Sequence, residues 1–140
     1  ARDVAAWGMT VWRVAGPVVR RQDVSITGLY PNDTWSGPSV RYVRRQCDGG
    51  SLLVTLSSDP ALFGAADTTV VARSGGTPAG RTTFGSSETT LLLVPLRPAN
   101  GTCVVDLAIG PTRNPSVVLP GSGDDRELGA HVAITFVPAE

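Results

Sequence analysis

The sequence predicts an all-β fold, an antiparallel two-sheet β-sandwich or jelly roll of about seven or eight strands. Helical periodicity is nearly absent, and short runs rich in Val, Thr, Leu and Ile alternate with polar residues. The 16 glycines and 11 prolines, together with Asn and Asp, separate these runs at short intervals. The chain has 140 residues and no linker between two globular-sized pieces, so we expect a single domain over 1–140.

Strands are expected in the N-terminal half at 7–14, 22–30, 39–47 and 50–59. Residues 7–14 alternate, with Trp7, Met9 and Val11 on one face, which is typical of an edge strand. The alternative is that 1–20 are a linker from a preceding segment. The run GSLLVTLSSD at 50–59 has the strongest strand pattern. The segment after it, 59–64, is expected to turn because Pro60 fixes φ.

Strands are expected in the C-terminal half at 67–73, 88–96, 102–110 and 130–138. The last of these places Val132, Ile134 and Phe136 on one face and His131 on the other. The stretch ARSGGTPAGRTTFGSS at 72–87 has the weakest pattern. Its glycines and serines predict a mobile loop or an irregular hairpin.

Charge and hydropathy exclude two classes of partner. The formal net charge is zero and no basic stripe is present, so no nucleic-acid partner is expected. No run approaches the roughly 18 apolar residues of a membrane span, so contact with a membrane is expected only through a parent protein. The sequence does not indicate an oligomeric state.

The residues that catalysis requires are few. His131 is the single histidine, and nothing close to it in sequence would orient it as a general base. No nucleophile elbow or phosphate-binding glycine loop occurs. The only adjacent carboxylates are Asp124 and Asp125, and neighbouring loop positions rarely converge on one substrate atom. We therefore expect the isolated domain not to be an enzyme, although a parent protein can be one.

The segment LYPNDTWSGP at 29–38 joins two expected strands and is the best candidate for a ligand site. It combines the aromatic rings of Tyr30 and Trp35 with the amide of Asn32 and the carboxylate of Asp33. An aromatic face suits the C–H side of a sugar, and planar polar groups suit its hydroxyls. The alternative is structural: Trp35 plugs the open end of the sandwich while Asn32 and Asp33 only build a turn.

The charged cluster DDREL at 124–128 allows two interpretations. Asp124 and Asp125 can cap a turn, with Arg126 as a structural residue that pairs with a carboxylate. They can also be ligands of a structural calcium ion, although two carboxylates are few for calcium. No other cofactor is expected.

The two cysteines, Cys47 and Cys103, each lie at the edge of an expected strand. A disulfide between them would close a long loop and stabilise the fold by roughly 4 kcal/mol. The alternative is two unrelated buried thiols. A disulfide would place the chain in an oxidising compartment, either secreted or on the outer side of a membrane.

Three stretches carry a resemblance to a known family. They are WSGPSVRYVRRQCDGGSLLVTLSSDPALF (35–63), the cysteine segment GTCVVDLAIGPTRNP (101–115) and GDDRELGAHV (123–132). Together they resemble the extracytoplasmic β-sandwich at the end of actinobacterial membrane glycosyltransferases of the cell envelope. Those domains are similar to carbohydrate-binding modules. The first thirty residues lie outside the resemblance.

The resemblance implies several properties of this chain. It implies that Cys47 and Cys103 pair, and that Asp124, Asp125 and Arg126 close the fold, with sugar or ion contact secondary. It also implies a non-catalytic, extracytoplasmic accessory module whose partner is a cell-envelope polysaccharide or other glycan. The alternative function is a structural or protein-docking β-sandwich without a sugar ligand.

Overall fold

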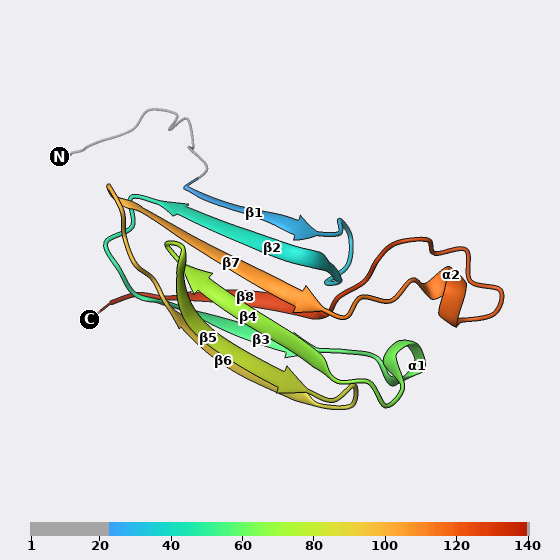
Figure 1. Cartoon of the computed structure of the whole chain (residues 1–140). Coiled ribbons are helices and arrows are strands. Elements are labelled where there is room, and N and C mark those ends of the chain that lie inside the picture. The colour runs from blue at the N-terminus through green and yellow to red at the C-terminus, as the bar shows by residue number, and fades with distance from the viewer. Residues whose placement is uncertain (1–22, 140) are drawn as a thin grey trace, which may run out of the picture.

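The structure, a computed structural model, describes residues 23–139, so the edge strand expected at 7–14 lies outside the described residues. Between 23 and 139 the chain forms eight strands and two one-turn helices (Figure 1). The elements are β1 (Val24–Leu29), β2 (Ser36–Arg45), β3 (Ser51–Ser57), α1 (Pro60–Phe63), β4 (Thr68–Ser74), β5 (Thr77–Phe84), β6 (Thr89–Pro95), β7 (Thr102–Gly110), α2 (Pro115–Val118) and β8 (His131–Val137).

The strands form two antiparallel sheets, which confirms the predicted all-β sandwich. The larger sheet has five strands in the order β1-β2-β7-β4-β5, and the smaller has three in the order β6-β3-β8. Strands distant in sequence pair within each sheet: β2 pairs with β7, and β3 pairs with β8. This topology brings the loops that follow β1, β3 and β7 to one end of the sandwich, on the right in Figure 1.

The core lies between the sheets and follows from strand alternation. In β3, Leu52, Val54 and Leu56 are fully buried, and the residues between them are only half-buried. Strand β7 alternates in the same way from Cys103 to Ile109. Each fully buried Leu or Val contributes about 1.5–3 kcal/mol relative to an exposed one. Burial of one face of each strand therefore fixes the register of both sheets.

The segment 72–87 is an irregular hairpin, so the mobile-loop alternative is wrong. Strand β4 ends at Ser74 and β5 begins at Thr77, with Gly75 and Gly76 as a two-residue turn at φ 60° and 82°. Such a Gly-Gly turn at positive φ matches the twist of a tight hairpin. A β-bulge at Ala72 makes the pairing irregular.

Two short helices occur in segments where the sequence analysis predicted a turn or no regular element. The segment 59–64 contains α1 rather than a simple turn, because the Asp59 carboxylate accepts a hydrogen bond from the Ala61 amide at 2.9 Å and caps the helix. Helix α2 was not expected, and Asn114 caps it in the same way. No helix in the described part of the chain is long and apolar enough to cross a membrane.

The disulfide Cys47–Cys103 is present, as the resemblance implied. Its Cα atoms lie 5.8 Å apart, within the range usual for a disulfide. Cys103 lies opposite Arg44 in the β2–β7 ladder, so the bond ties the loop after β2 to the start of β7. Both cysteines are buried, and the alternative of two separate thiols is excluded.

Candidate functional site

The 30–35 loop forms a tight turn between β1 and β2. The Tyr30 amide donates to the Trp35 carbonyl at 2.9 Å, and the Trp35 amide donates to the Asp33 carboxylate at 3.0 Å. Asn32 adopts φ 69°, a left-handed conformation that Asn tolerates better than most residues. Asn32 and Asp33 therefore build the turn, as the structural alternative requires, and both remain exposed to solvent.

Arg126 connects this turn to the loop that precedes β8. Its guanidinium donates from Nε and Nη2 to the two oxygens of Asp124 at 2.9 and 2.7 Å, and from Nη1 to Asp33 at 2.8 Å. The same guanidinium lies 4.8 Å from the centre of the Tyr30 ring, in cation–π geometry. The Tyr30 hydroxyl donates to the Glu127 carbonyl at 3.1 Å. The Arg126–Asp33 pair thus fastens two distant loops together, and Asp124 holds the guanidinium in place from within its own loop.

The ion pairs shift the pKa values of their members. Hydrogen bonds from Arg126 lower the pKa of Asp124 from its ordinary value of 3.8 to about 2. The same guanidinium lowers the pKa of Asp33. The two carboxylates in turn raise the pKa of Arg126. All three groups are therefore charged at neutral pH.

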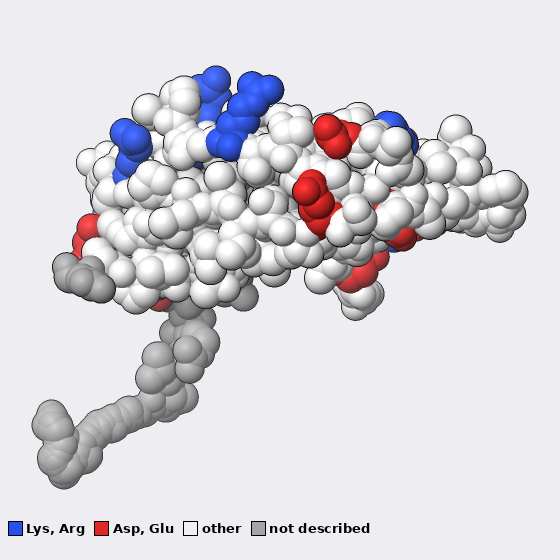
Figure 2. All heavy atoms as spheres, turned by 90° about the horizontal axis from the view of Figure 1, so that it is seen from below, with Lys and Arg blue, Asp and Glu red and all other residues white. Residues whose placement is uncertain are grey.

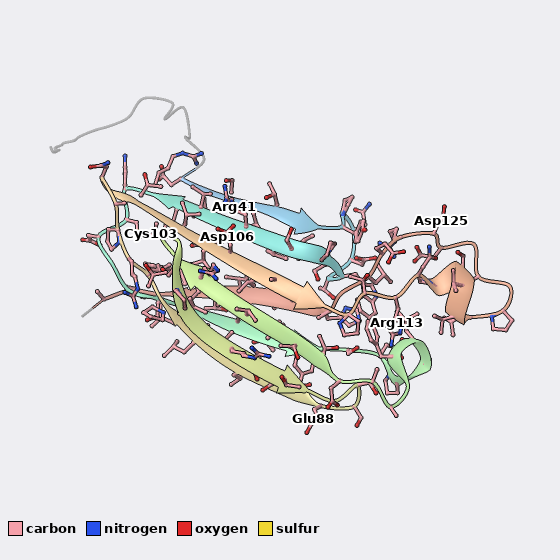
Figure 3. The ribbon with its side chains drawn as sticks, viewed as in Figure 1. Arg41, Glu88, Cys103, Asp106, Arg113 and Asp125 are labelled. Carbon is pink, nitrogen blue, oxygen red and sulfur yellow. A yellow bond between two sulfur atoms is a disulfide. The ribbon has the colours of Figure 1, made fainter. Side chains whose placement is uncertain are left out.

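Trp35 packs into an aromatic cluster beneath the loop. Its ring centre lies 3.8 Å from that of His131 and 6.2 Å from that of Phe63 at the end of α1. The Arg113 guanidinium lies 5.4 Å from the centre of the Phe63 ring, and Figure 3 shows Arg113 pointing toward α1. Trp35 is half-buried, so it acts as a partial plug and keeps part of its surface at the solvent boundary.

His131 is held by this cluster and by a hydrogen bond. The Thr34 hydroxyl lies 2.6 Å from its Nδ1 atom. Burial lowers the pKa of His131, and the nearby carboxylates of Asp33 and Asp59 oppose that shift only in part. The imidazole is therefore neutral at pH 7.

Asp124 and Asp125, the candidate calcium ligands, are not brought together. Both oxygens of Asp124 accept hydrogen bonds from Arg126. Asp125 lies on the outer side of the loop beyond α2 (Figure 3), and its Oδ1 atom is 3.5 Å from the Ser116 hydroxyl. Between residues 23 and 139 there is no group of three or more His, Cys, Asp or Glu side chains that could hold a metal ion. The arrangement suits loop closure better than ion binding.

Four residues that contact the 30–35 loop or the Trp35 cluster were not predicted from the sequence to do so: Phe63, Arg113, Glu127 and His131. Phe63 follows a turn signal, and His131 lies in a strand, so neither carries a local signal for contact with Trp35. The contact arises because Trp35, the residue before β2, forms an isolated antiparallel bridge with His131, the first residue of β8 in the other sheet. Only the packing of the two sheets brings them together.

A second candidate surface is the outer face of the β6-β3-β8 sheet. It consists of the side chains that alternate with the buried ones, namely Thr89, Leu91, Leu93, Pro95, Ser51, Leu53, Thr55, Ser57, His131, Ala133, Thr135 and Val137. None of them is Asp, Glu, Lys or Arg, and we call this surface the uncharged face. Leu91 and Leu93 are 61% and 58% exposed. Figure 2 views the molecule from below Figure 1 and shows a surface made mostly of uncharged atoms, with a few separate groups of acidic and basic atoms.

Comparisons with protein families, curated proteins and solved structures find no match for this chain. A proposal for its function therefore rests on these two surfaces, on the disulfide and on the chemistry of the individual residues.

Proposed function

We propose that this chain is a non-catalytic, extracytoplasmic accessory module that binds a cell-envelope polysaccharide through the 30–35 loop. The observation that carries the proposal is the arrangement of this loop. It holds a partly exposed indole, that of Trp35, next to the exposed polar side chains of Asn32 and Thr34. A sugar ring that rests against the indole edge would place its hydroxyls within reach of these groups.

The rigidity of the loop favours binding. Arg126 fixes Asp33, and His131 and Phe63 fix the Trp35 ring. A site already held in its bound geometry loses little conformational entropy when a ligand arrives. The contacts that make Trp35 a plug therefore also make the 30–35 loop a preorganised platform.

The charges at this end support a non-catalytic role. A glycosidase needs one carboxyl group that stays protonated near the working pH and acts as a general acid. Arg126 instead lowers the pKa of both Asp33 and Asp124, so these groups are unsuited to donate a proton at neutral pH. The pKa of His131 is lowered by burial, and its Nδ1 atom is engaged by Thr34.

The disulfide supports the proposed compartment. Such bonds form and persist in secreted and extracytoplasmic proteins and are rare in reducing cytosol. Because the Cys47–Cys103 bond is buried, thiol reductants in solution have little access to it. Envelope polysaccharides are exposed in the same compartment, which makes them the natural class of glycan partner for this proposal.

The experiment that tests sugar binding is a titration of the isotope-labelled chain with envelope polysaccharide fragments, observed by NMR at the indole N–H of Trp35. Asn32→Gly keeps the turn and removes the amide, because glycine adopts the positive φ of this position. Its matched control is Asn100→Gly, at φ 54° in another turn. We expect Asn32→Gly to weaken binding about tenfold, equivalent to about 1.4 kcal/mol. Equal affinity in both variants, or no saturable shift at all, would reject the proposal.

The uncharged face favours a second candidate function, that of a docking domain. Two neighbouring exposed leucines on a sheet surface without charges are typical of an interaction site. If this face docks onto another copy, sedimentation should show association at high concentration that Leu91→Glu abolishes. Val117→Glu, at an equally apolar and 81% exposed position on α2, is the control. A monomer at all concentrations would count against docking between copies.

A further inference from the structure

The outer face of the five-stranded sheet differs in charge from the uncharged face. The side chains that alternate with the buried ones in β2, β4 and β5 include four arginines, namely Arg41, Arg45, Arg73 and Arg81. In the five strands of this sheet, Asp106 of β7 is the one acidic residue. We call this surface the arginine face. Its strands therefore present four positive charges and one negative charge to solvent.

Arg41, Asp106 and Arg73 form one row across three neighbouring strands. Asp106 is the register partner of Arg41 on one side and of Arg73 on the other. The Arg41 guanidinium donates to both carboxylate oxygens of Asp106, from Nε at 2.7 Å and from Nη2 at 3.2 Å (Figure 3). A guanidinium pairs with a planar carboxylate in this bidentate way. Asp106 thereby neutralises one of the two arginines beside it.

The guanidinium groups on this face point in different directions. Arg41 is directed at Asp106, whereas Arg73 donates from Nη1 to the Gly76 carbonyl at 3.3 Å, in the turn between β4 and β5. The Cα atoms of Arg41 and Arg73 are two strand spacings apart, about 10 Å. Arg81 is a diagonal neighbour of Arg73 on the adjacent strand, at about 7–8 Å. This spacing suits an extended ligand with several anionic groups better than a single small anion.

The side chains between the arginines are small. The outward positions of the five strands hold Val, Ala, Thr and Ser but no aromatic residue, Leu, Ile or Met. A helix or sheet that binds a membrane surface places large apolar side chains beside its basic ones. A site for single-stranded nucleic acid adds aromatic rings on which bases stack. The arginine face has neither feature, and its hydroxyl groups, such as those of Thr69 and Thr83, suit the hydroxyls of sugars.

We propose that the arginine face binds an acidic polysaccharide, with Arg73 and Arg81 pairing with carboxylate groups on different sugar residues of the polymer. Charge complementarity carries the proposal, and the Arg41–Asp106 pair is an example of the expected geometry within the face itself. The face is a different surface from the 30–35 loop, so the proposal does not depend on sugar binding there. The formal net charge of the chain is zero, and this charge pattern appears only when β2, β4 and β5 share a sheet.

A titration of the isotope-labelled full chain with two polymers of carboxylated sugars, polygalacturonate and alginate, tests the proposal by NMR. We expect saturable shifts of the Nε–H signals of Arg73 and Arg81 and of the backbone amides around them, with the indole N–H of Trp35 unchanged. Added salt should weaken this binding, because the charges are exposed and are screened. Dextran, a neutral polymer, should shift none of these signals.

Substitutions on and off the face provide the controls. Arg73→Gln combined with Arg81→Gln should weaken binding about tenfold, since two exposed ion pairs are lost. Asp106→Asn should strengthen binding about threefold, because it removes the negative charge from the face and releases Arg41. Asp125→Asn changes the overall charge equally but lies on the loop beyond α2, so its affinity should stay that of the unmodified chain.

Four results would overturn the proposal. They are the absence of saturable shifts with both polymers, equal binding of dextran, equal gains in Asp106→Asn and Asp125→Asn, and shifts confined to Trp35 and the 30–35 loop. The last result would place the acidic polymer at the loop and leave sugar binding there intact. Binding to vesicles of phosphatidylglycerol without binding to either polymer would also overturn it, and would assign the arginine face to a lipid surface.

Discussion

At the scale of single residues, Arg126 has the largest influence on the end of the sandwich. One planar guanidinium donates to Asp33 and Asp124 and lies over Tyr30. Lysine could not replace these contacts, because its ammonium lacks the planar fork that pairs bidentately with Asp124 while the same group lies over the Tyr30 ring. The pairs are about one-third exposed, so their strength depends on the protonation of the carboxylates and on salt.

The lowered pKa of Asp124 predicts how stability depends on pH. A carboxyl group whose pKa is lower in the folded state stabilises the fold above its unfolded pKa of about 4, and this contribution is lost as the pH falls through the folded value of about 2. We therefore expect the free energy of unfolding to fall between pH 4 and pH 2. The decline should be shallower in Asp124→Asn, and urea denaturation at each pH measures it.

The neighbouring Asp125 is the matched control for this prediction, because its carboxylate approaches Ser116 rather than an arginine. Asp125→Asn should keep the slope of the unmodified chain. Identical slopes in all three proteins would show that the Asp124–Arg126 pair does not form in solution.

At the scale of elements, the β1–β2 hairpin depends on one glycine. Gly28 has φ 98° at a β-bulge opposite the start of β2. A Cβ atom there would lie 2.0 Å from the Ser39 carbonyl oxygen, far inside van der Waals contact. Because the clash involves backbone on both sides, a side chain cannot relieve it by rotating.

We expect Gly28→Ala to unfold the hairpin or to reduce the free energy of unfolding by several times the cost of Gly76→Ala. Gly76 also has positive φ, 82°, but a Cβ atom there meets nothing within 4 Å. Its substitution should cost about 1–2 kcal/mol from backbone strain alone. Chemical denaturation of both variants separates strain from clash, and equal losses would show that the bulge at Gly28 relaxes.

At the scale of the whole molecule, the disulfide joins segments that are 56 residues apart in sequence. This separation includes all of β3, β4, β5 and β6, so the bond restricts most of the unfolded chain. In the chain-entropy treatment a loop of this length is worth roughly 4 kcal/mol. That is a large share of the roughly 5–15 kcal/mol that stabilises an ordinary domain.

Replacement of both cysteines by alanine should therefore lower the free energy of unfolding by about 2–5 kcal/mol while leaving the sandwich intact. Guanidinium denaturation followed by circular dichroism measures the loss. The unmodified chain with and without a reductant is the control for the substitution itself. A loss below about 1 kcal/mol would contradict a loop-closing role for this bond.

The class of fold and most of the strands could be predicted from the sequence, because period-two burial is a local pattern. Strand β7 was predicted at its observed bounds, and β3 and β8 within two residues. In the hairpin at 72–87 the Gly-Gly turn is visible in the sequence. Strand β5 was nevertheless not predicted as a strand, because most of its residues are polar or small and lack an apolar alternation. The cluster DDREL indicated an arginine–carboxylate pair as one of two interpretations, since a carboxylate beside an arginine is also a local signal, and the structure contains the Arg126–Asp124 pair.

The contacts among the residues at the loop end of the sandwich could not be predicted, because they depend on how the two sheets pack. The partners Asp33 and Arg126 are 93 residues apart, and Trp35 meets His131 through a bridge between the two sheets. A local pattern shows which face of a strand is apolar. It does not show which strand pairs with it or which strand of the other sheet packs against that face. The same limit applies to the uncharged face, because an uncovered sheet surface exists only after the order of strands is set.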